Sequence, residues 1–119
     1  MTKNTESTRY YSNIQEESVC KIVKGKRQPN SGASNFSAGD VVNKEASILV
    51  ECKTTLKDKD SFSIKKEWLE KNKEEMKSLR LSNHCLAFNF GPNQNNYFII
   101  DEKLMKFLIL KLEEDNMEE

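Results

Sequence analysis

Two short apolar runs, separated by a polar tetrapeptide, lie near the middle of the chain. The runs cover residues 39–42 and 47–55, and the tetrapeptide covers residues 43–46. Runs rich in Val, Ile and Leu on either side of a polar turn predict a β-hairpin. With the turn centred between Glu45 and Ala46, Asp40 lies directly opposite Glu51 on the neighbouring strand.

Because side chains alternate between the two faces of a strand, Lys53 joins Asp40 and Glu51 on one face of this hairpin. Two opposed carboxylates repel each other, whereas a divalent cation favours both in their ionised forms. Mg²⁺ suits such a pair, since it binds carboxylate oxygens and keeps waters that a phosphate can replace. A lysine beside it can orient an attacking water or stabilise charge that develops on phosphorus. The alternative is a solvent-facing hairpin whose charges pair diffusely.

A helix is predicted before the hairpin, over residues 13–24, with Asn13 as its cap and Gly25 as its terminator. At about 100° per residue its apolar side chains share one arc, and Glu16 lies at the edge of that arc, where it can reach over the sheet. Glu16 is therefore a candidate third carboxylate, and an ordinary surface glutamate is the alternative. The polar residues 1–12 are interpreted as a flexible arm.

The remaining elements follow from apolar stripes with caps for helices, and from alternation or apolar runs for strands. In chain order they are a loop or irregular strand over 26–38, a helix over 64–79 capped by Ser63, strands over 85–90 and 97–100, and a helix over 102–112 capped by Asp101. The order α-β-β-β-α-β-β-α predicts an α/β fold, a mixed sheet of about four to five strands with helices on both faces. Apolar residues nearly encircle the last helix, which is typical of a subunit interface.

Composition favours one domain, over residues 13–112, in a reducing compartment. The 119 residues are 36% hydrophobic and 32% charged, and no apolar run reaches the ~20 residues that span a bilayer. Three widely spaced cysteines without a CxxC pair argue against a disulfide framework or a zinc site. His84, the only histidine, is interpreted as a strand residue and not as a ligand. We therefore expect a cytoplasmic location and no membrane partner.

The net charge of zero conceals an uneven distribution. Residues 113–119 form a predicted acidic tail with five acids, so residues 1–112 hold 19 basic and 14 acidic groups, a net charge of +5. Basic residues beside a predicted metal site are suited to binding the phosphates of a nucleic acid. The candidates for contact with phosphates are Lys24, Lys26, Arg27, Ser31 and Lys66.

Five short motifs follow one another along residues 13–101. They are Gln15-Glu16, Ser31-Gly32-Ala33, Gly39-Asp40-Val41, Glu51-Cys52-Lys53-Thr54-Thr55, and Ser61-Phe62-Ser63-Ile64 with Trp68-Leu69. In this order they resemble the PD-(D/E)xK nuclease superfamily, and within it the archaeal Holliday-junction resolvases and their bacteriophage-encoded relatives. The proline that usually precedes the aspartate in the superfamily is Gly39 here.

The resemblance implies a restriction-endonuclease-like fold and Mg²⁺-dependent hydrolysis of DNA, with Mn²⁺ as a substitute. The implied metal ligands are Glu16, Asp40, Glu51 and the backbone carbonyl of Cys52. The implied catalytic residues are Glu16, Ser31, Asp40, Glu51 and Lys53, of which Lys53 would activate or orient the attacking water. The implied partners are branched or double-stranded DNA and a second copy of the chain, because a two-fold dimer supplies two sites for symmetric cuts. A bacteriophage-encoded member would act in the host cytoplasm.

Three functions remain open. The first is a resolvase of four-way junctions, and the second is a nuclease of the same fold that acts on flaps, ends or plain duplex. The third is a DNA-binding or regulatory protein that has kept the fold and lost the activity. The opposed Asp40 and Glu51, together with Lys53, argue against the third, because an inactive site has no reason to keep like charges opposed.

Overall fold

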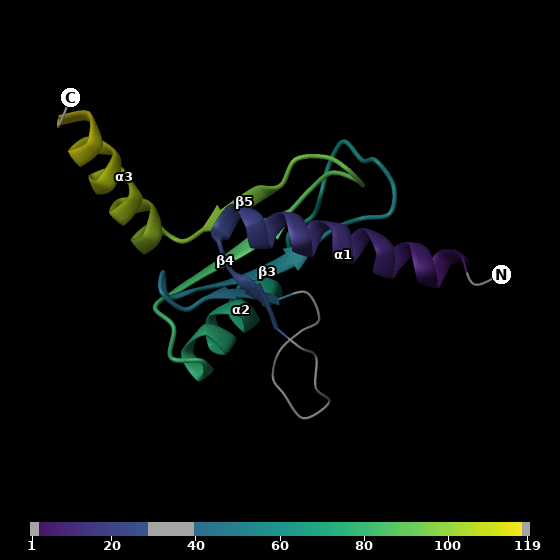
Figure 1. Cartoon of the computed structure of the whole chain (residues 1–119), viewed down its shortest axis with the longest axis horizontal. Helices are drawn as coiled ribbons and strands as arrows, with labels where there is room; N and C mark the ends of the chain where they lie inside the picture. The colour runs from purple at the N-terminus through teal and green to yellow at the C-terminus, as the bar shows by residue number, and fades with distance from the viewer. Residues whose placement is uncertain (1–2, 29–39, 118–119) are drawn as a thin grey trace.

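The apolar runs of the sequence form one five-stranded mixed sheet with helices on both faces (Figure 1). The fold is that of a computed structural model, which describes residues 3–28 and 40–117. In chain order the elements are α1 (Lys3–Val23), β1 (Lys26–Arg27), β2 (Asp40–Asn43), β3 (Ile48–Lys53), α2 (Lys66–Ser78), β4 (Asn83–Phe88), β5 (Tyr97–Ile100) and α3 (Glu102–Met117). The predicted order of elements and the predicted α/β class are both confirmed.

Strand order in the sheet follows the chain, from β1 at one edge to β5 at the other. All neighbouring strands are antiparallel except β3 and β4, which run parallel because α2 connects them in a crossover. The predicted hairpin is formed by β2 and β3, and its register pairs Asp40 with Glu51 and Val41 with Val50, as the sequence predicts.

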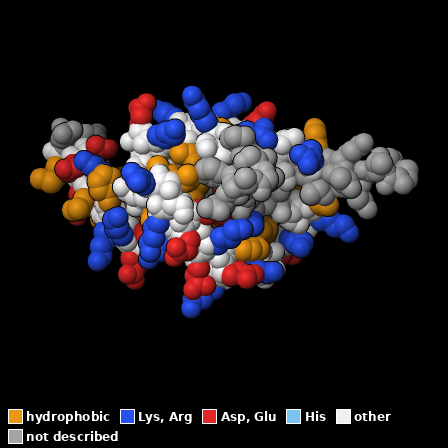
Figure 2. All heavy atoms as spheres, turned by 90° about the horizontal axis from the view of Figure 1, so that it is seen from below, with side chains coloured by type: hydrophobic (Ala, Val, Ile, Leu, Met, Phe, Trp, Pro, Cys, Tyr) orange, Lys and Arg blue, Asp and Glu red, His pale blue; other side chains and the backbone are white. Residues whose placement is uncertain are grey.

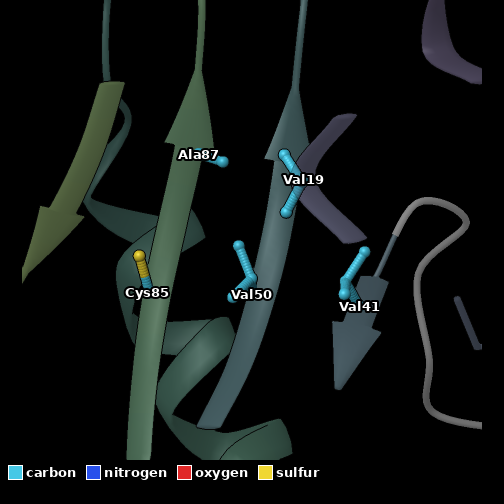
Figure 3. Packing of buried hydrophobic residues seen from close by; sticks show 5 residues of the cluster. All are labelled: Val19, Val41, Val50, Cys85 and Ala87. Atoms are coloured by element: carbon cyan, nitrogen blue, oxygen red, sulfur yellow. The ribbon is translucent and has the colours of Figure 1, made fainter. Parts of the chain in front are cut away.

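The two faces of the sheet are covered by different helices. Val19 of α1 packs on side chains that alternate along β2, β3 and β4, and Figure 3 shows it lying over Val41, Val50 and Ala87. On the opposite face α2 contacts β3 and β4. There Phe88 of β4 lies 5.3 Å, between ring centroids, from Phe62 in the segment before α2. Asp40, Glu51 and Lys53 alternate onto this second face.

The first helix begins earlier than predicted. It starts at Lys3 and not at Asn13, so Asn13 is an interior residue and not the cap. A search for apolar periodicity misses the first turns because they are polar, although no Gly or Pro interrupts them. The helix ends where expected, since Lys24 adopts a left-handed φ of 56° and the N–H of Gly25 bonds to the carbonyl of Cys20 at 3.0 Å.

Three other predicted boundaries are wrong by a few residues. The helix α2 begins at Lys66, and Ser63 does not cap it, because the chain stays extended through Lys65 while Phe62 packs on the sheet. The strand β4 runs over 83–88 and not 85–90, since the side chain of Asn89 turns back to accept from the N–H of Gly91 at 3.3 Å. The last helix continues to Met117, so most of the predicted acidic tail is helical.

The helix α3 extends away from the body of the molecule (Figure 1). None of its residues is buried, and its apolar side chains gather at one end of the surface in Figure 2. The exposed apolar residues of α3 are Met105, Phe107, Leu108, Ile109, Leu110, Leu112 and Met117. No helix in the described ranges combines the length and the apolarity that crossing a bilayer requires.

Candidate active site

Two buried carboxylates face each other across the β2–β3 ladder. Asp40 is the first residue of β2 and is 0% exposed, and its partner in the register, Glu51, is 2% exposed. Side chains of directly opposed residues lie about 5 Å apart at their Cβ atoms. A pair of acidic groups at this distance in the interior is costly unless a positive charge compensates for it.

Lys53 supplies one such charge. Its Nζ lies 3.1 Å from Oε2 of Glu51, and it also lies 4.5 Å from the ring centroid of Trp68 on α2. The contact with the ring holds the ammonium group on the carboxylate side of the sheet, since a cation is attracted to the aromatic face. The lysine side chain keeps 30% exposure, so the ammonium group remains accessible to a ligand from solvent.

Among the described residues, Oε1 of Glu51 is buried and has no hydrogen-bond partner. A buried ionised oxygen is stabilised by a hydrogen bond or by a metal ion. Carboxylates are hard oxygen donors of the kind that Mg²⁺ prefers, so these two residues fit the ion that the sequence implies.

Glu16 of α1 lies on the other side of the sheet, where an arginine binds it. Its Oε1 lies 2.7 Å from the Nη2 of Arg27, which also donates to Oδ1 of Asn13 at 2.8 Å. No group of three or more His, Cys, Asp or Glu side chains in the described part of the chain is arranged to hold a metal. The three predicted carboxylates are thus not gathered into one cluster, and the role of Glu16 as a ligand stays a prediction.

Cys52 lies between Glu51 and Lys53 and points to the α1 face. Burial, and then the negative charges of Glu16 and Asp40, raise the pKa of its thiol far above the ordinary value. Both carboxylates therefore lie within electrostatic range of the same thiol, although they come from different elements. Burial also raises the pKa of Cys85 to about 12, so both thiols are protonated at neutral pH. The role of the Cys52 carbonyl as a ligand stays a prediction.

The predicted phosphate contacts are divided between the two faces. Lys26 pairs with Val42 in the register and so shares the face of Asp40, and Lys66 begins α2, which covers that face. Arg27 lies on the opposite face, where it binds Glu16, and Lys24 is exposed directly after α1. Ser31, predicted to act in catalysis and in DNA binding, lies outside the described residues.

Two contacts at the site were not predicted from the sequence. From the sequence Trp68 is only part of the last of the five motifs, with no role of its own, yet its ring lies 4.5 Å from the ammonium of Lys53. Gln15, which is 3% exposed, donates to the backbone carbonyl of Lys53 at 2.7 Å and so ties α1 to the end of β3. The only sequence signal for a role of Gln15 is its position beside Glu16. A hydrogen bond between residues that are 38 positions apart leaves no local pattern in the sequence.

His84 is a strand residue in β4, as the sequence predicts, and it lies apart from this site. Its Nδ1 is 2.9 Å from Oδ1 of Asn72, and its Nε2 is 3.5 Å from Oδ2 of Asp101. Burial lowers the pKa of the imidazole, although the charge of Asp101 acts in the opposite direction. The histidine therefore remains neutral at physiological pH.

Comparison with known proteins yields no relative for this chain. No family model, no curated protein sequence and no solved structure matches it.

Proposed function

We propose that this chain is a metal-dependent endonuclease that hydrolyses phosphodiester bonds of DNA at four-way junctions. The observation that carries the proposal is the pair of buried, directly opposed carboxylates, Asp40 and Glu51, with Lys53 beside them. A merely structural hairpin would avoid this arrangement, because it places like charges opposite each other inside the protein. The order of motifs that resembles the junction resolvases supports the same function.

The residues of the site have separate tasks in this proposal. Asp40, Glu51 and the Cys52 carbonyl, with Glu16 from α1, would hold Mg²⁺. When bound, this ion supplies Lewis-acid chemistry, since it activates water and neutralises charge on the phosphate. Lys53 keeps its ammonium group 3.1 Å from Glu51, in position to hydrogen-bond to the attacking water and to a phosphate oxygen. Trp68 keeps that ammonium in place through its ring.

The reaction is a hydrolysis and needs no other co-reactant than water. The oxygen of the water forms a bond to phosphorus while the bond from phosphorus to the 3′ oxygen breaks. The water loses a proton, and the leaving oxygen gains one and becomes a hydroxyl. The products are a 5′ phosphate and a 3′ hydroxyl. Lys53 offsets the negative charge that develops on the phosphate oxygens during this step.

Recognition of the DNA would depend on shape and on phosphate contacts. Lys26 and Lys66 lie on the face of the carboxylates, where they would neutralise the backbone on either side of the cut. A second copy of the chain would supply a second site at a fixed distance, as two symmetric cuts require. The exposed apolar side chains of α3 support this homodimer, because such a surface is typical of an interface. A cytoplasmic location belongs to the same proposal.

The experiment that tests this function compares three labelled substrates: a four-way junction, a flapped duplex and a linear duplex of the same sequence. Each is incubated with and without Mg²⁺, with the wild-type chain and with Asp40→Asn. We expect paired, symmetric nicks in the junction only, in Mg²⁺ only, and only with the wild type. Glu45→Gln, the same chemical change in the exposed turn of the same hairpin, is the matched control and should cut normally.

The other outcomes identify the alternatives. Equal cutting of all three substrates would reject junction selectivity and leave a general nuclease. Binding of DNA without cutting, in Mg²⁺ and in Mn²⁺, would reject the enzyme and leave a DNA-binding protein.

A further inference from the structure

A polar cavity of about 480 Å³ lies on the α1 face of the sheet, between α1 and the turn that joins β4 to β5. Its volume is within the range of about 300–1,000 Å³ that is usual for sites of small molecules. Its lining includes Tyr11, Gln15, Thr54, Asn89, Asn93 and Asn96.

The inner wall of this cavity is a network of amide side chains that fix one another. Asn96 accepts from Gln15 at 3.2 Å and donates to the hydroxyl of Ser18 at 3.2 Å. Asn89 donates to the same oxygen of Asn96 at 3.5 Å and accepts from the hydroxyl of Thr54 at 2.8 Å. These groups therefore satisfy one another's hydrogen bonds and hold the wall in one arrangement without a ligand.

The outer rim carries amides that are available to a ligand. Asn93 and Asn95 are exposed at the mouth of the cavity, and their side chains make no hydrogen bond to any described residue. Across the cavity lie Tyr11 and the apolar side chains of α1, Ile14 and Ile22. The cavity thus combines a planar aromatic ring, apolar contact area and pairs of neutral donors and acceptors.

The chemistry of the lining selects a class of ligand. None of the described residues that line the cavity is charged, so it offers nothing to neutralise a phosphate or a metal ion. Asparagine and glutamine side chains form paired hydrogen bonds with the edges of bases, and aromatic rings stack on base faces. An uncharged, flat group with donors and acceptors at its edge fits this lining best.

We propose that this cavity receives one unpaired nucleobase of the DNA substrate, which Asn93 and Asn95 bind at its edge and Tyr11 contacts at its face. This inference rests on the proposed function and names a feature of its substrate: a base that is not stacked within a continuous duplex. Bases leave the stack readily at branch points, bulges and strand ends, and the energetic cost is least there.

The cavity is linked directly to the proposed catalytic strand. Thr54, which lines it, follows Lys53 in the chain, and Gln15 bonds both to the Lys53 carbonyl and to Asn96. The cavity therefore adjoins the end of β3, on the face of the sheet opposite the side chain of Lys53. The cavity gives the enzyme a physical reason to favour branched over continuous DNA, which the carboxylates alone do not supply.

The test measures the affinity of the intact chain for two bulged duplexes that differ only in one group. One carries a single unpaired nucleotide, and the other carries an abasic nucleotide at the same position, so their backbone charge and shape are alike. Binding is followed by fluorescence anisotropy in Ca²⁺, in place of Mg²⁺, to limit cutting. We expect the wild type to bind the bulge with a base about tenfold more tightly, the value of one good paired contact.

Two variants and one control make the result specific. Asn93→Gly combined with Asn95→Ala should lower the preference to less than about threefold, because the paired contact is lost. Glycine keeps the left-handed φ of 64° at position 93. Tyr11→Leu should lower the preference independently, and Asn116→Ala, on exposed α3, should leave it unchanged. Far-ultraviolet circular dichroism checks that every variant is folded.

Each outcome decides the inference. Equal affinity of the wild type for the two bulges overturns it, and so does a preference that persists in both cavity variants. If the wild type binds no DNA at all, the inference and the proposed function fail together. If the preference is present but Mg²⁺ gives no cutting of any substrate, the proposed function fails and the base site stands. If cutting occurs without the preference, only the base site is wrong.

Discussion

Removing the negative charge of Asp40 should change the stability of the protein in opposite directions with and without metal. Asp40 and Glu51 are opposed and buried, so in metal-free buffer each raises the energy of the other. Asp40→Asn keeps the size of the side chain and removes the repulsion. We therefore expect the variant to be more stable than the wild type in a chelating buffer and to gain nothing when Mg²⁺ is added.

The magnitude follows from the geometry of the ladder. The Cβ atoms of opposed residues lie about 5 Å apart, and unit charges at a separation of this order interact by about 3 kcal/mol at an effective dielectric constant of about 20. The ammonium of Lys53, 3.1 Å from Glu51, offsets part of this repulsion. We expect a gain of about 1–2 kcal/mol in the free energy of unfolding for Asp40→Asn without metal. For the wild type, Mg²⁺ at about tenfold its dissociation constant should add about 1.4 kcal/mol.

The assay is urea unfolding at neutral pH, followed by circular dichroism, in chelator and in excess Mg²⁺. The wild type, Asp40→Asn and the control Glu45→Gln are compared, because the control removes a carboxylate from the exposed turn of the same hairpin. The control should respond to Mg²⁺ as the wild type does. If Asp40→Asn is less stable than the wild type in chelator and still gains stability from Mg²⁺, the opposed charges do not form a cation site.

Three further changes test other parts of the account. Lys53→Met keeps an apolar stem near Trp68 but removes the ammonium group. Single-turnover cutting of the junction should therefore slow by about 100-fold or more, while the affinity for DNA changes little. An unchanged cutting rate would exclude a catalytic role for Lys53. Because burial lowers the pKa of His84 below its ordinary value of 6.5, the unfolded chain binds the proton more readily, and the free energy of unfolding should fall as the pH drops below 6.5 through the lowered pKa. His84→Gln should remove that part of the pH dependence in urea unfolding, and an NMR titration of the single imidazole that gives a pKa above 6.5 would contradict this prediction. Ile109→Lys, at an exposed apolar position of α3, should shift sedimentation from dimer to monomer, whereas a wild type that is already monomeric would show that α3 does not pair two copies.

The sequence predicts the β-hairpin in detail because its information is local. Two apolar runs and a polar tetrapeptide predict both strands, and a turn centred between Glu45 and Ala46 places Asp40 opposite Glu51. The position of Lys53 on the same face as Asp40 and Glu51 follows from strand alternation alone. For the same reason the order of the elements could be predicted correctly, since each element carries its own pattern.

The sequence does not predict those features that depend on packing between distant segments of the chain. The polar start of α1 and the extended segment before α2 carry no periodic signal, so both boundaries were wrong. The contacts of Lys53 with Gln15 and Trp68 join distant parts of the chain, and only the assembled sheet brings them together. The pairing of Glu16 with Arg27 across the edge of the sheet is of the same kind, because neither residue signals the other in the sequence.

The most direct test of the central claim is the chemical nature of the ends produced from a four-way junction in Mg²⁺. We predict two nicks, placed symmetrically about the branch point, each with a 5′ phosphate that ligase can reseal. The Glu45→Gln control should give the same products, and Asp40→Asn should give none. Intact junction strands after incubation of the wild type with Mg²⁺ or Mn²⁺, or equal cutting by Asp40→Asn, would contradict the claim that the opposed carboxylates form a nuclease site.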